Sequence, residues 1–396
     1  MRRLGVTFFL ALMAGAASPP ALAQPAPQSF PTPLPEESLP SVATLPAHYP
    51  PSWVLVHDMN MASLIDGKVA VVDTASADRP LKGTVRASQF AFYLYSAKNN
   101  EIYTLETFYP RLNRGERTDA ITIWDTATLQ PKGEIVLPGG KRQQSLGYKN
   151  VFQFTNGEKW ALVQNFTPGQ SVRVVDLVHR KILNEIDLPG CAHVYPMGER
   201  GFMSLCADGS ITSIALDEQG QVAASKAQPG VYDIDRQPMF NMPATIGKTA
   251  WFVTFYGKLK PFDLSGPAAR PLKGDWSLGT APGGEPEWRP SGFQVVTADA
   301  RGLLYVVMTP HGVEGTHKDG GTEIWVYDPA KKLRVARFPL QGATMSIELT
   351  HEATPHIVAA RADGTIDIYD AATGAFVRTL GGAVATMPIT ITAGGQ

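Results

Sequence analysis

Long hydrophobic runs are missing from this chain beyond its first residues. A membrane-spanning helix needs about 20 consecutive apolar residues, and the one long apolar segment, residues 4–17, is too short to span a bilayer. It follows Arg2 and Arg3 and precedes the small-x-small motif Ala21-Leu22-Ala23, an arrangement typical of a cleavable signal peptide. The sequence therefore predicts a signal peptide over residues 1–23, no membrane span, and an exported, soluble mature protein.

Strong charge of either sign is missing as well. Without the two arginines of the leader, the chain has 33 basic and 36 acidic residues, a net charge of −3, and no run of lysine or arginine. Nucleic acids and anionic membranes are bound by basic patches or basic tails. The composition therefore argues against both as partners.

Cysteine is nearly absent, with only Cys191 and Cys206 in the whole chain. In an exported protein an even pair usually forms a disulfide. A bond closing a loop of this size stabilises the fold by roughly 3 kcal/mol if its geometry is unstrained. The alternative is a redox-active pair, which would favour a Cys-x-x-Cys spacing that the sequence does not have.

Proline is dense in one place only, residues 24–51. Such a segment, with few bulky apolar residues, resists packing and is predicted to be an extended N-terminal arm. The remainder, residues 52–396, is longer than an ordinary single domain unless its architecture repeats.

The remainder does repeat. A short alternating strand that ends in aspartate recurs at intervals of 41 to 65 residues, which suits the blade of a β-propeller. The seven segments are GKVAVVD ending at Asp73, AITIWD at Asp125, SVRVVD at Asp176, GSITSIALD at Asp217, GKLKPFD at Asp263, TEIWVYD at Asp328 and GTIDIYD at Asp370. Each aspartate is expected to cap the following turn with its side chain.

Most of these segments follow another strand at hairpin distance, as KWALVQNF precedes SVRVVDL and HIVAARA precedes TIDIYDA. Asp208-Gly209 and Asp363-Gly364 supply turns in which a positive φ is needed. Helical periodicity is nearly absent. We therefore predict an all-β fold, a seven-bladed β-propeller over residues 52–396, with sandwich repeats as the less favoured alternative.

Motifs that carry catalysis are scarce. The sequence has no His-Glu-x-x-His, no G-x-S-x-G elbow and no Cys-x-x-Cys-His haem site. His311 and His317 share one loop without a third ligand at convincing spacing, so we predict no metal site. Asp58, Asp233 and Asp235 are not paired as acid and base. We assign no catalytic residue to this chain.

One charged segment stands out, TFYPRLNRGERTDAITIWD over residues 107–125. It places Arg111, Arg114 and Arg117 in a loop between two strands of one blade, and the loop is longer than a hairpin needs. The segment is either a solvated loop held by local ion pairs, which are individually weak, or a surface that contacts a partner.

This segment resembles the heavy subunit of the tryptophan tryptophylquinone amine dehydrogenases, and the similarity runs along nearly the whole mature chain. It includes VVDL at 174–177, the cysteine pair in GCAHVYPMGERGFMSLCADGSI, WRPSGFQ at 288–294, GDWSL at 274–278 and EGTHKDGGTEIWVYDPAKKLRVARFPL at 314–340. The last two are more similar to aromatic amine dehydrogenase than to methylamine dehydrogenase.

The resemblance implies a periplasmic seven-bladed propeller with an intrachain disulfide between Cys191 and Cys206. It implies a complex of two heavy and two cysteine-rich light subunits that oxidises a primary amine to aldehyde and ammonia. The tryptophan tryptophylquinone and the catalytic base belong to the light subunit, so this chain holds no cofactor. Electrons pass to a blue copper protein of the azurin or amicyanin type.

The resemblance also implies site residues. In the family an aromatic residue of the heavy chain lies at the mouth of the substrate channel, and that position falls here on Gln89, beside Phe90 and Phe92. Either Phe90 takes the role or the entrance is more polar in this protein; alternatively, both phenylalanines belong to the blade core. Arg111, Arg114 and Arg117 are expected to contact the light subunit through carboxylates.

Two other functions stay open. A stand-alone periplasmic propeller could bind a ligand or protein without redox chemistry. A self-contained propeller enzyme, such as a lactonase, would need a convergent set of catalytic groups that the sequence does not display.

Overall fold

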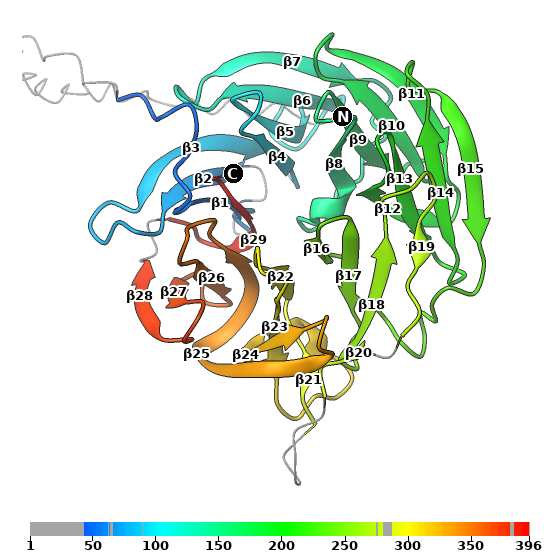
Figure 1. Cartoon of the computed structure of the whole chain (residues 1–396). Helices are drawn as coiled ribbons and strands as arrows, with labels where there is room; N and C mark the ends of the chain where they lie inside the picture. The colour runs from blue at the N-terminus through cyan, green and yellow to red at the C-terminus, as the bar shows by residue number, and fades with distance from the viewer. Residues whose placement is uncertain are drawn as a thin grey trace, which may run out of the picture. The chain divides into compact units, whose positions relative to one another are not determined.

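The computed structural model describes residues 43–395 apart from positions 62, 64, 65, 89, 275, 280–286 and 381–383. The predicted signal peptide and most of the predicted Pro-rich arm therefore lie outside the described residues. Within the described part, the only helices are two single 3-10 turns, Lys149–Val151 (η1) and Thr316–Lys318 (η2). Antiparallel sheets stand around a common axis like the blades of a propeller (Figure 1). The prediction of an all-β propeller is confirmed.

Five sheets of four or five strands are separate blades, each ordered from the axis outward. The first holds β29 (Pro388–Ala393), β1 (Trp53–Asp58), β2 (Asp66–Asp73) and β3 (Leu81–Ser88). The second holds β4 (Phe92–Ser96), β5 (Glu101–Phe108), β6 (Thr118–Asp125) and β7 (Pro131–Leu137), and the third holds β8 (Phe152–Thr155), β9 (Trp160–Asn165), β10 (Ser171–Asp176) and β11 (Lys181–Asp187). The fourth holds β12 (Cys191–Pro196), β13 (Gly201–Cys206), β14 (Ile211–Leu216) and β15 (Val222–Gln228), and the fifth holds β16 (Ala244–Ile246), β17 (Thr249–Val253), β18 (Lys258–Asp263), β19 (Arg270–Pro271) and β20 (Trp276–Ser277).

The sixth sheet has eight strands and departs from the prediction of seven separate blades. Its strands are β21 (Arg289–Pro290), β22 (Val296–Ala298), β23 (Leu304–Thr309), β24 (Gly321–Asp328), β25 (Leu333–Leu349), β26 (His356–Arg361), β27 (Ile366–Asp370) and β28 (Phe376–Leu380). The first half of β25 pairs with β24 and its second half pairs with β26. Because the chain stays extended through all 17 residues of β25, the strands β21 to β25 and the strands β25 to β28 form one hydrogen-bonded sheet.

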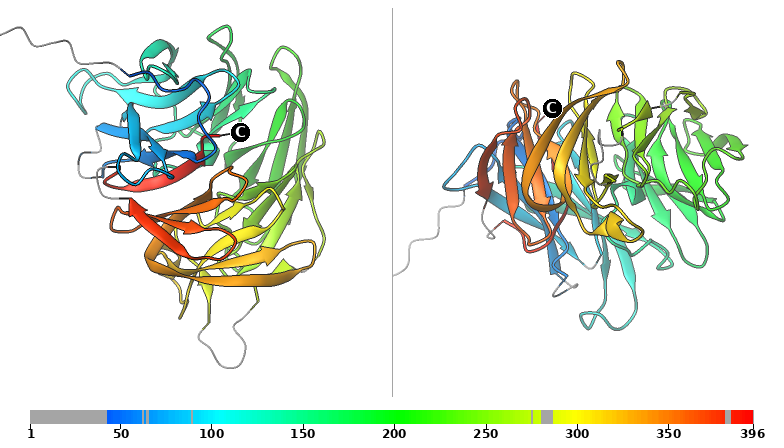
Figure 2. Two further views of the ribbon diagram at one scale, coloured as in Figure 1. Left: turned by 60° about the vertical axis from the view of Figure 1, so that its left-hand side comes forward. Right: turned by 90° about the horizontal axis from the view of Figure 1, so that it is seen from below.

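The two ends of the described chain close the ring. The C-terminal strand β29 pairs with β1, with Val54 opposite Ala393 and Val56 opposite Ile391. In Figure 2 the segments from both ends lie side by side in one blade, and the strands run between the two faces of the ring. Closure by backbone hydrogen bonds removes the free sheet edges that an open array of blades would leave.

The seven aspartates of the repeat cap their turns as predicted. Each Oδ1 accepts a hydrogen bond of 2.9–3.1 Å from the backbone N–H two residues further on. They are Asp73, Asp125, Asp176, Asp217, Asp263, Asp328 and Asp370, at or just after the ends of β2, β6, β10, β14, β18, β24 and β27. Seven copies of the hairpin unit are therefore present, although two of them share the sixth sheet.

Burial is graded outward along each sheet. The second strands β1 and β9 are buried at every position, whereas the outermost strand β15 is exposed at all but one. The apolar core lies between neighbouring sheets, where Phe92 and Leu105 of one blade pack with Phe152 and Val163 of the next. The disulfide between Cys191 and Cys206 is confirmed, and it links facing positions of β12 and β13 inside such a core.

Strand order sorts the connections onto two faces. Connections that enter an innermost strand, and loops between second and third strands, lie at the same end of every sheet because neighbouring strands are antiparallel. They include residues 109–117, 166–170, 229–243 and 310–320, and we call this end the long-loop face. The remaining turns form the opposite, short-turn face.

Candidate functional site: the axial pocket and the long-loop face

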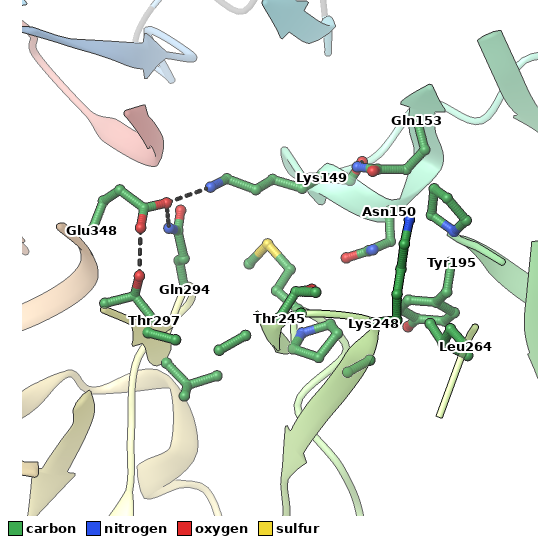
Figure 3. Close-up of a pocket in the computed structure, with 18 of the residues that line it drawn as sticks. Lys149, Asn150, Gln153, Tyr195, Thr245, Lys248, Leu264, Gln294, Thr297 and Glu348 are labelled. Atoms are coloured by element: carbon green, nitrogen blue, oxygen red, sulfur yellow. Dashed lines mark hydrogen bonds and ion pairs between the residues drawn. The ribbon is translucent and has the colours of Figure 1, made fainter. Parts of the chain in front are cut away.

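A polar pocket of about 490 Å³ lies on the axis, lined by innermost strands of several sheets (Figure 3). Glu348 of β25 accepts hydrogen bonds from Gln294 Nε2 at 3.0 Å and from the Thr297 hydroxyl, and Lys149 Nζ lies 3.0 Å from its Oε2. Gln294 also donates to the carbonyl of Ile391 in β29 at 3.1 Å. Both oxygens of Glu348 are engaged, so this carboxylate links residues from several elements around the axis.

An apolar pocket of about 570 Å³ opens toward the long-loop face. Tyr148 and Phe293 stack there with ring centroids 4.9 Å apart, and His193 meets Tyr148 edge-on at 5.6 Å. Burial lowers the pKa of His193 to about 4, so the ring is neutral at pH 7, and its Nε2 lies 3.1 Å from the side-chain amide of Asn241. Three methionines also line this pocket, Met239, Met345 and Met387. The lining of this pocket is thus mostly apolar, and Lys318, Asp319 and Arg361 add charged side chains to it.

Of the residues predicted at the substrate channel, Phe90 precedes β4 and Phe92 begins it, at the long-loop end of that strand. Gln89 is outside the described residues. Phe90 is in the turn before β4 with φ of 49°, and its carbonyl accepts a hydrogen bond from Arg142 Nη1 at 2.8 Å. Phe92 is 3% exposed and packs in the core between two sheets, as the alternative interpretation had it. A channel role for these residues stays a prediction.

The three arginines of the charged loop do not behave alike. Arg117 pairs with Asp119 through two contacts, Nε to Oδ1 at 2.8 Å and Nη2 to Oδ2 at 3.0 Å. Arg111 and Arg114 are exposed, a backbone bridge joins them, and neither side chain has an ion pair within the described part of the chain. The solvated-loop interpretation, which relied on local ion pairs, therefore accounts for Arg117 alone.

A buried ionic network lies beneath this loop and was not singled out from the sequence. Arg142 is 1% exposed; its Nε donates to the hydroxyl of Thr107 at 2.6 Å and lies 3.7 Å from Asp119. Burial lowers the pKa of Arg142 to about 9, against the opposing effect of the Asp119 carboxylate. For the carboxyl group of Glu106, burial has the opposite effect and raises the pKa. Glu106 accepts hydrogen bonds from the Ser88 amide and from two threonine hydroxyls. The network ties the Phe90 turn to the base of the charged loop.

Exposed apolar side chains gather on the long-loop face. Its loops carry six large ones, and Phe108 at the end of β5 makes a seventh; the six are Met61, Leu112, Phe166, Ile234, Tyr256 and Val313. Among the described residues the short-turn face carries one, Val178, and the other exposed large apolar side chains lie on the outermost strands. Because water-exposed apolar groups are stabilised by burial at about 25 cal/mol per Å², this distribution favours the long-loop face as the one that binds another molecule.

Other chemistry is sparse in the residues that can be described. No group of three histidine, cysteine, aspartate or glutamate side chains lies together in a way that could hold a metal ion. His317 lies in η2 and His311 lies earlier in the same loop. Asp58 has a structural role, because its carboxylate accepts hydrogen bonds from the backbone N–H groups of Asn60, Thr386 and Met387. None of the described helices is long and apolar enough to cross a membrane.

His57 provides a pH-dependent test of the fold at this face. Burial lowers its pKa to about 4, against an opposing effect of Asp58, whereas a histidine in the unfolded chain titrates near 6.5. Because the unfolded state binds the proton more readily, the contribution of neutral His57 to the free energy of unfolding is complete above pH 6.5 and is lost as the pH falls toward 4. This contribution amounts to about 3 kcal/mol.

We expect urea midpoints of the wild type to fall between pH 6.5 and 4.5, and those of His57→Phe to fall less over the same interval. Phenylalanine keeps the edge-on contact with Tyr93. Replacing the exposed His311 by glutamine serves as the control and should leave the pH dependence unchanged. Equal slopes for His57→Phe and the wild type would contradict the assignment.

Together, these features define a β-propeller scaffold with a polar pocket on its axis and an apolar pocket on the long-loop face, where exposed apolar side chains and two arginines without ion pairs among the described residues also lie. The family model described as methylamine dehydrogenase heavy chain matches residues 54–393, which covers the whole ring. The chain therefore belongs to the methylamine dehydrogenase heavy chain family, and membership of a heavy-chain family implies a light subunit as partner.

Individual relatives agree. The methylamine dehydrogenase heavy chain of Methylorubrum extorquens is 27% identical over 315 residues, 78% of this chain and 74% of the relative. That of Methylophilus methylotrophus is 26% identical over 302 residues, 74% of this chain and 72% of the relative. A protein of unknown function from Desulfotomaculum acetoxidans is similar in structure, with a TM-score of 0.55, 10% identity and coverage of 86% of this chain and 99% of that chain. The last similarity concerns the fold alone.

Proposed function

We propose that this chain is the non-catalytic heavy subunit of a periplasmic quinoprotein amine dehydrogenase. The complex would convert a primary amine and water to an aldehyde and ammonia, releasing two protons and two electrons. The match to the heavy-chain family across residues 54–393 carries this proposal. The electrons would be accepted by a tryptophan tryptophylquinone in the light subunit and passed singly to a blue copper protein.

In this proposal the long-loop face docks the light subunit. Seven exposed apolar side chains supply area to bury. Arg111 and Arg114 supply guanidinium groups that are free to pair with carboxylates in the bidentate geometry that arginine favours. The apolar pocket and the Phe90 turn lie on the same face, so the docked partner would meet both.

Three finer features belong to the same proposal. Two heavy and two light subunits assemble, as the resemblance implies. The ring would count as seven blades if the sixth sheet were divided at β25, whose first half pairs with β24 and whose second half pairs with β26. The preferred amines are aralkylamines, on the basis of GDWSL at 274–278 and the segment 314–340, whereas the heavy-chain relatives found belong to methylamine dehydrogenases.

The test is amine-dependent reduction of a redox dye by the enzyme purified from its native source. We expect turnover of phenethylamine or tyramine above that of methylamine, and no turnover by the separated heavy subunit. Preference for methylamine would leave the assignment to the amine dehydrogenases intact and would contradict the proposed preference for aralkylamines. If the chain purifies from its native source without any light subunit, and the preparation reduces no dye with any amine, the redox assignment is removed and a binding scaffold is left.

A further inference from the structure

A second cavity opens on the long-loop face, between the fifth and sixth sheets. Its volume is about 370 Å³, within the range of pockets that bind small molecules. It lies beside the apolar pocket of the long-loop face, because both cavities are lined by Met239, Phe240 and His317. Its walls come from residues 229–243, the turn between β17 and β18, and the loop between β23 and β24.

Three aromatic rings line this cavity, those of Phe240, Phe255 and Tyr256. Backbone hydrogen bonds hold the wall in place: Phe240 N–H donates to the Val253 carbonyl at 2.9 Å, and Phe255 N–H donates to the Pro238 carbonyl at 2.9 Å. Phe255 is 8% exposed, whereas Tyr256 is 44% exposed. The cavity therefore presents an ordered aromatic surface to solvent.

Two of these rings already accept a cation. The Arg289 guanidinium carbon lies 4.8 Å from the centre of Phe255 and 4.6 Å from that of Tyr256. The charge of Arg289 is matched by Glu287, whose Oε1 lies 2.8 Å from Nη2. Arg289 is thus paired with Glu287 and is not among the residues that line the cavity.

Asp235 and Glu314 are the carboxylates of the cavity. Both are exposed, and neither has an ion pair within the described residues, while the nearby Asp233 has Arg236 as a partner at 3.8 Å. Two uncompensated negative charges beside aromatic faces disfavour an anion and favour a cation with an apolar body. A metal ion is a poor match, because no cluster of three ligating side chains occurs in the described chain.

We propose that this cavity is an amine-binding subsite of the heavy chain, which takes a primary ammonium group attached to an aromatic or bulky apolar body. The ammonium group lies between Asp235 and Glu314, and the body packs on Phe240 and Tyr256. The inference rests on the proposed function, since it places substrate of that chemistry on the face that docks the light subunit. A methylammonium ion has no body to cover the rings and binds much more weakly.

The test is isothermal titration of the full chain, without a light subunit, with phenethylamine, methylamine and phenylacetate. We expect phenethylamine to bind and the other two to show no saturable binding. The double variant Asp235→Asn/Glu314→Gln should weaken phenethylamine binding at least tenfold. The matched control Glu134→Gln/Glu218→Gln, which removes two exposed carboxylates elsewhere, should leave it unchanged.

Absence of phenethylamine binding, or equal affinity in the double variant and the wild type, would overturn the subsite. If free amine does not bind but the double variant weakens light-subunit association, the occupant is a basic side chain of the partner and the subsite is likewise overturned. The proposed function is scored separately by association and dye reduction. If the chain assembles with a light subunit and the complex turns over amine, but the separate heavy chain does not bind amine, only the subsite is overturned and the proposed function stands.

Discussion

Replacing Arg142 by methionine is expected to lower the free energy of unfolding by roughly 3–5 kcal/mol, the cost of removing one partner of a buried charge pair. The guanidinium is buried and donates to Thr107, to the carbonyls of Glu106 and Phe90, and toward Asp119. Its loss removes the donor that Thr107 and the carbonyls of Glu106 and Phe90 share in a buried site, whereas Asp119 keeps hydrogen bonds from Arg117 and Thr107. Urea unfolding of the full chain measures the effect.

The matched control is Arg79→Met, which removes an exposed arginine and should change stability by less than about 0.5 kcal/mol. Arg142→Lys keeps the charge and loses the fork of donors, so it should lie between methionine and the wild type. If Arg142→Met were as stable as Arg79→Met, the network would not be what holds the Phe90 turn to the loop base.

Reversing the charge of Arg111 and Arg114 together is expected to weaken light-subunit association about 10- to 100-fold, or roughly 1.4–2.7 kcal/mol. Both side chains are exposed and without ion pairs in the described chain, so they are available to carboxylates of a partner. The folded chain does not rely on them, and its urea midpoint should stay within error of the wild type.

Arg117→Glu provides the contrast within the same loop. Arg117 is engaged with Asp119 and with the carbonyl of Arg142, so its reversal should reduce the stability of the chain itself. Unchanged association of the Arg111→Glu/Arg114→Glu variant would remove the loop from the interface. A loss of stability equal to that of Arg117→Glu would show that the two exposed arginines have structural partners.

Much of the propeller could be predicted because second and third strands are buried on both faces. That burial produces apolar runs such as those of β9 and β10, and the terminal aspartates mark where each repeat ends. The innermost strands were harder to recognise because they are short, as the three residues of β16 show. The joining of two groups of strands through β25 could not be predicted, because alternation of apolar and polar residues does not show which strands share one sheet.

The site was less accessible to sequence reasoning. Arg117 and Asp119 are two residues apart at the start of β6, where alternate side chains share a face, so their pairing could have been anticipated. Arg142 could not, because it lies in a polar connection before β8 and meets its partners from 23 to 52 residues away. The aromatic–carboxylate cavity likewise combines segments far apart in the sequence, Asp235 with Glu314.

Hydrogen–deuterium exchange of the full chain, with and without its light subunit, tests most directly whether the long-loop face is the docking face. The account predicts slower exchange on binding in residues 109–117, 166–170 and 310–320, which lie on the long-loop face. It predicts unchanged exchange in the short-turn face, for example in residues 126–130 and 177–180. Protection confined to the short-turn face, or none on either face, would contradict it.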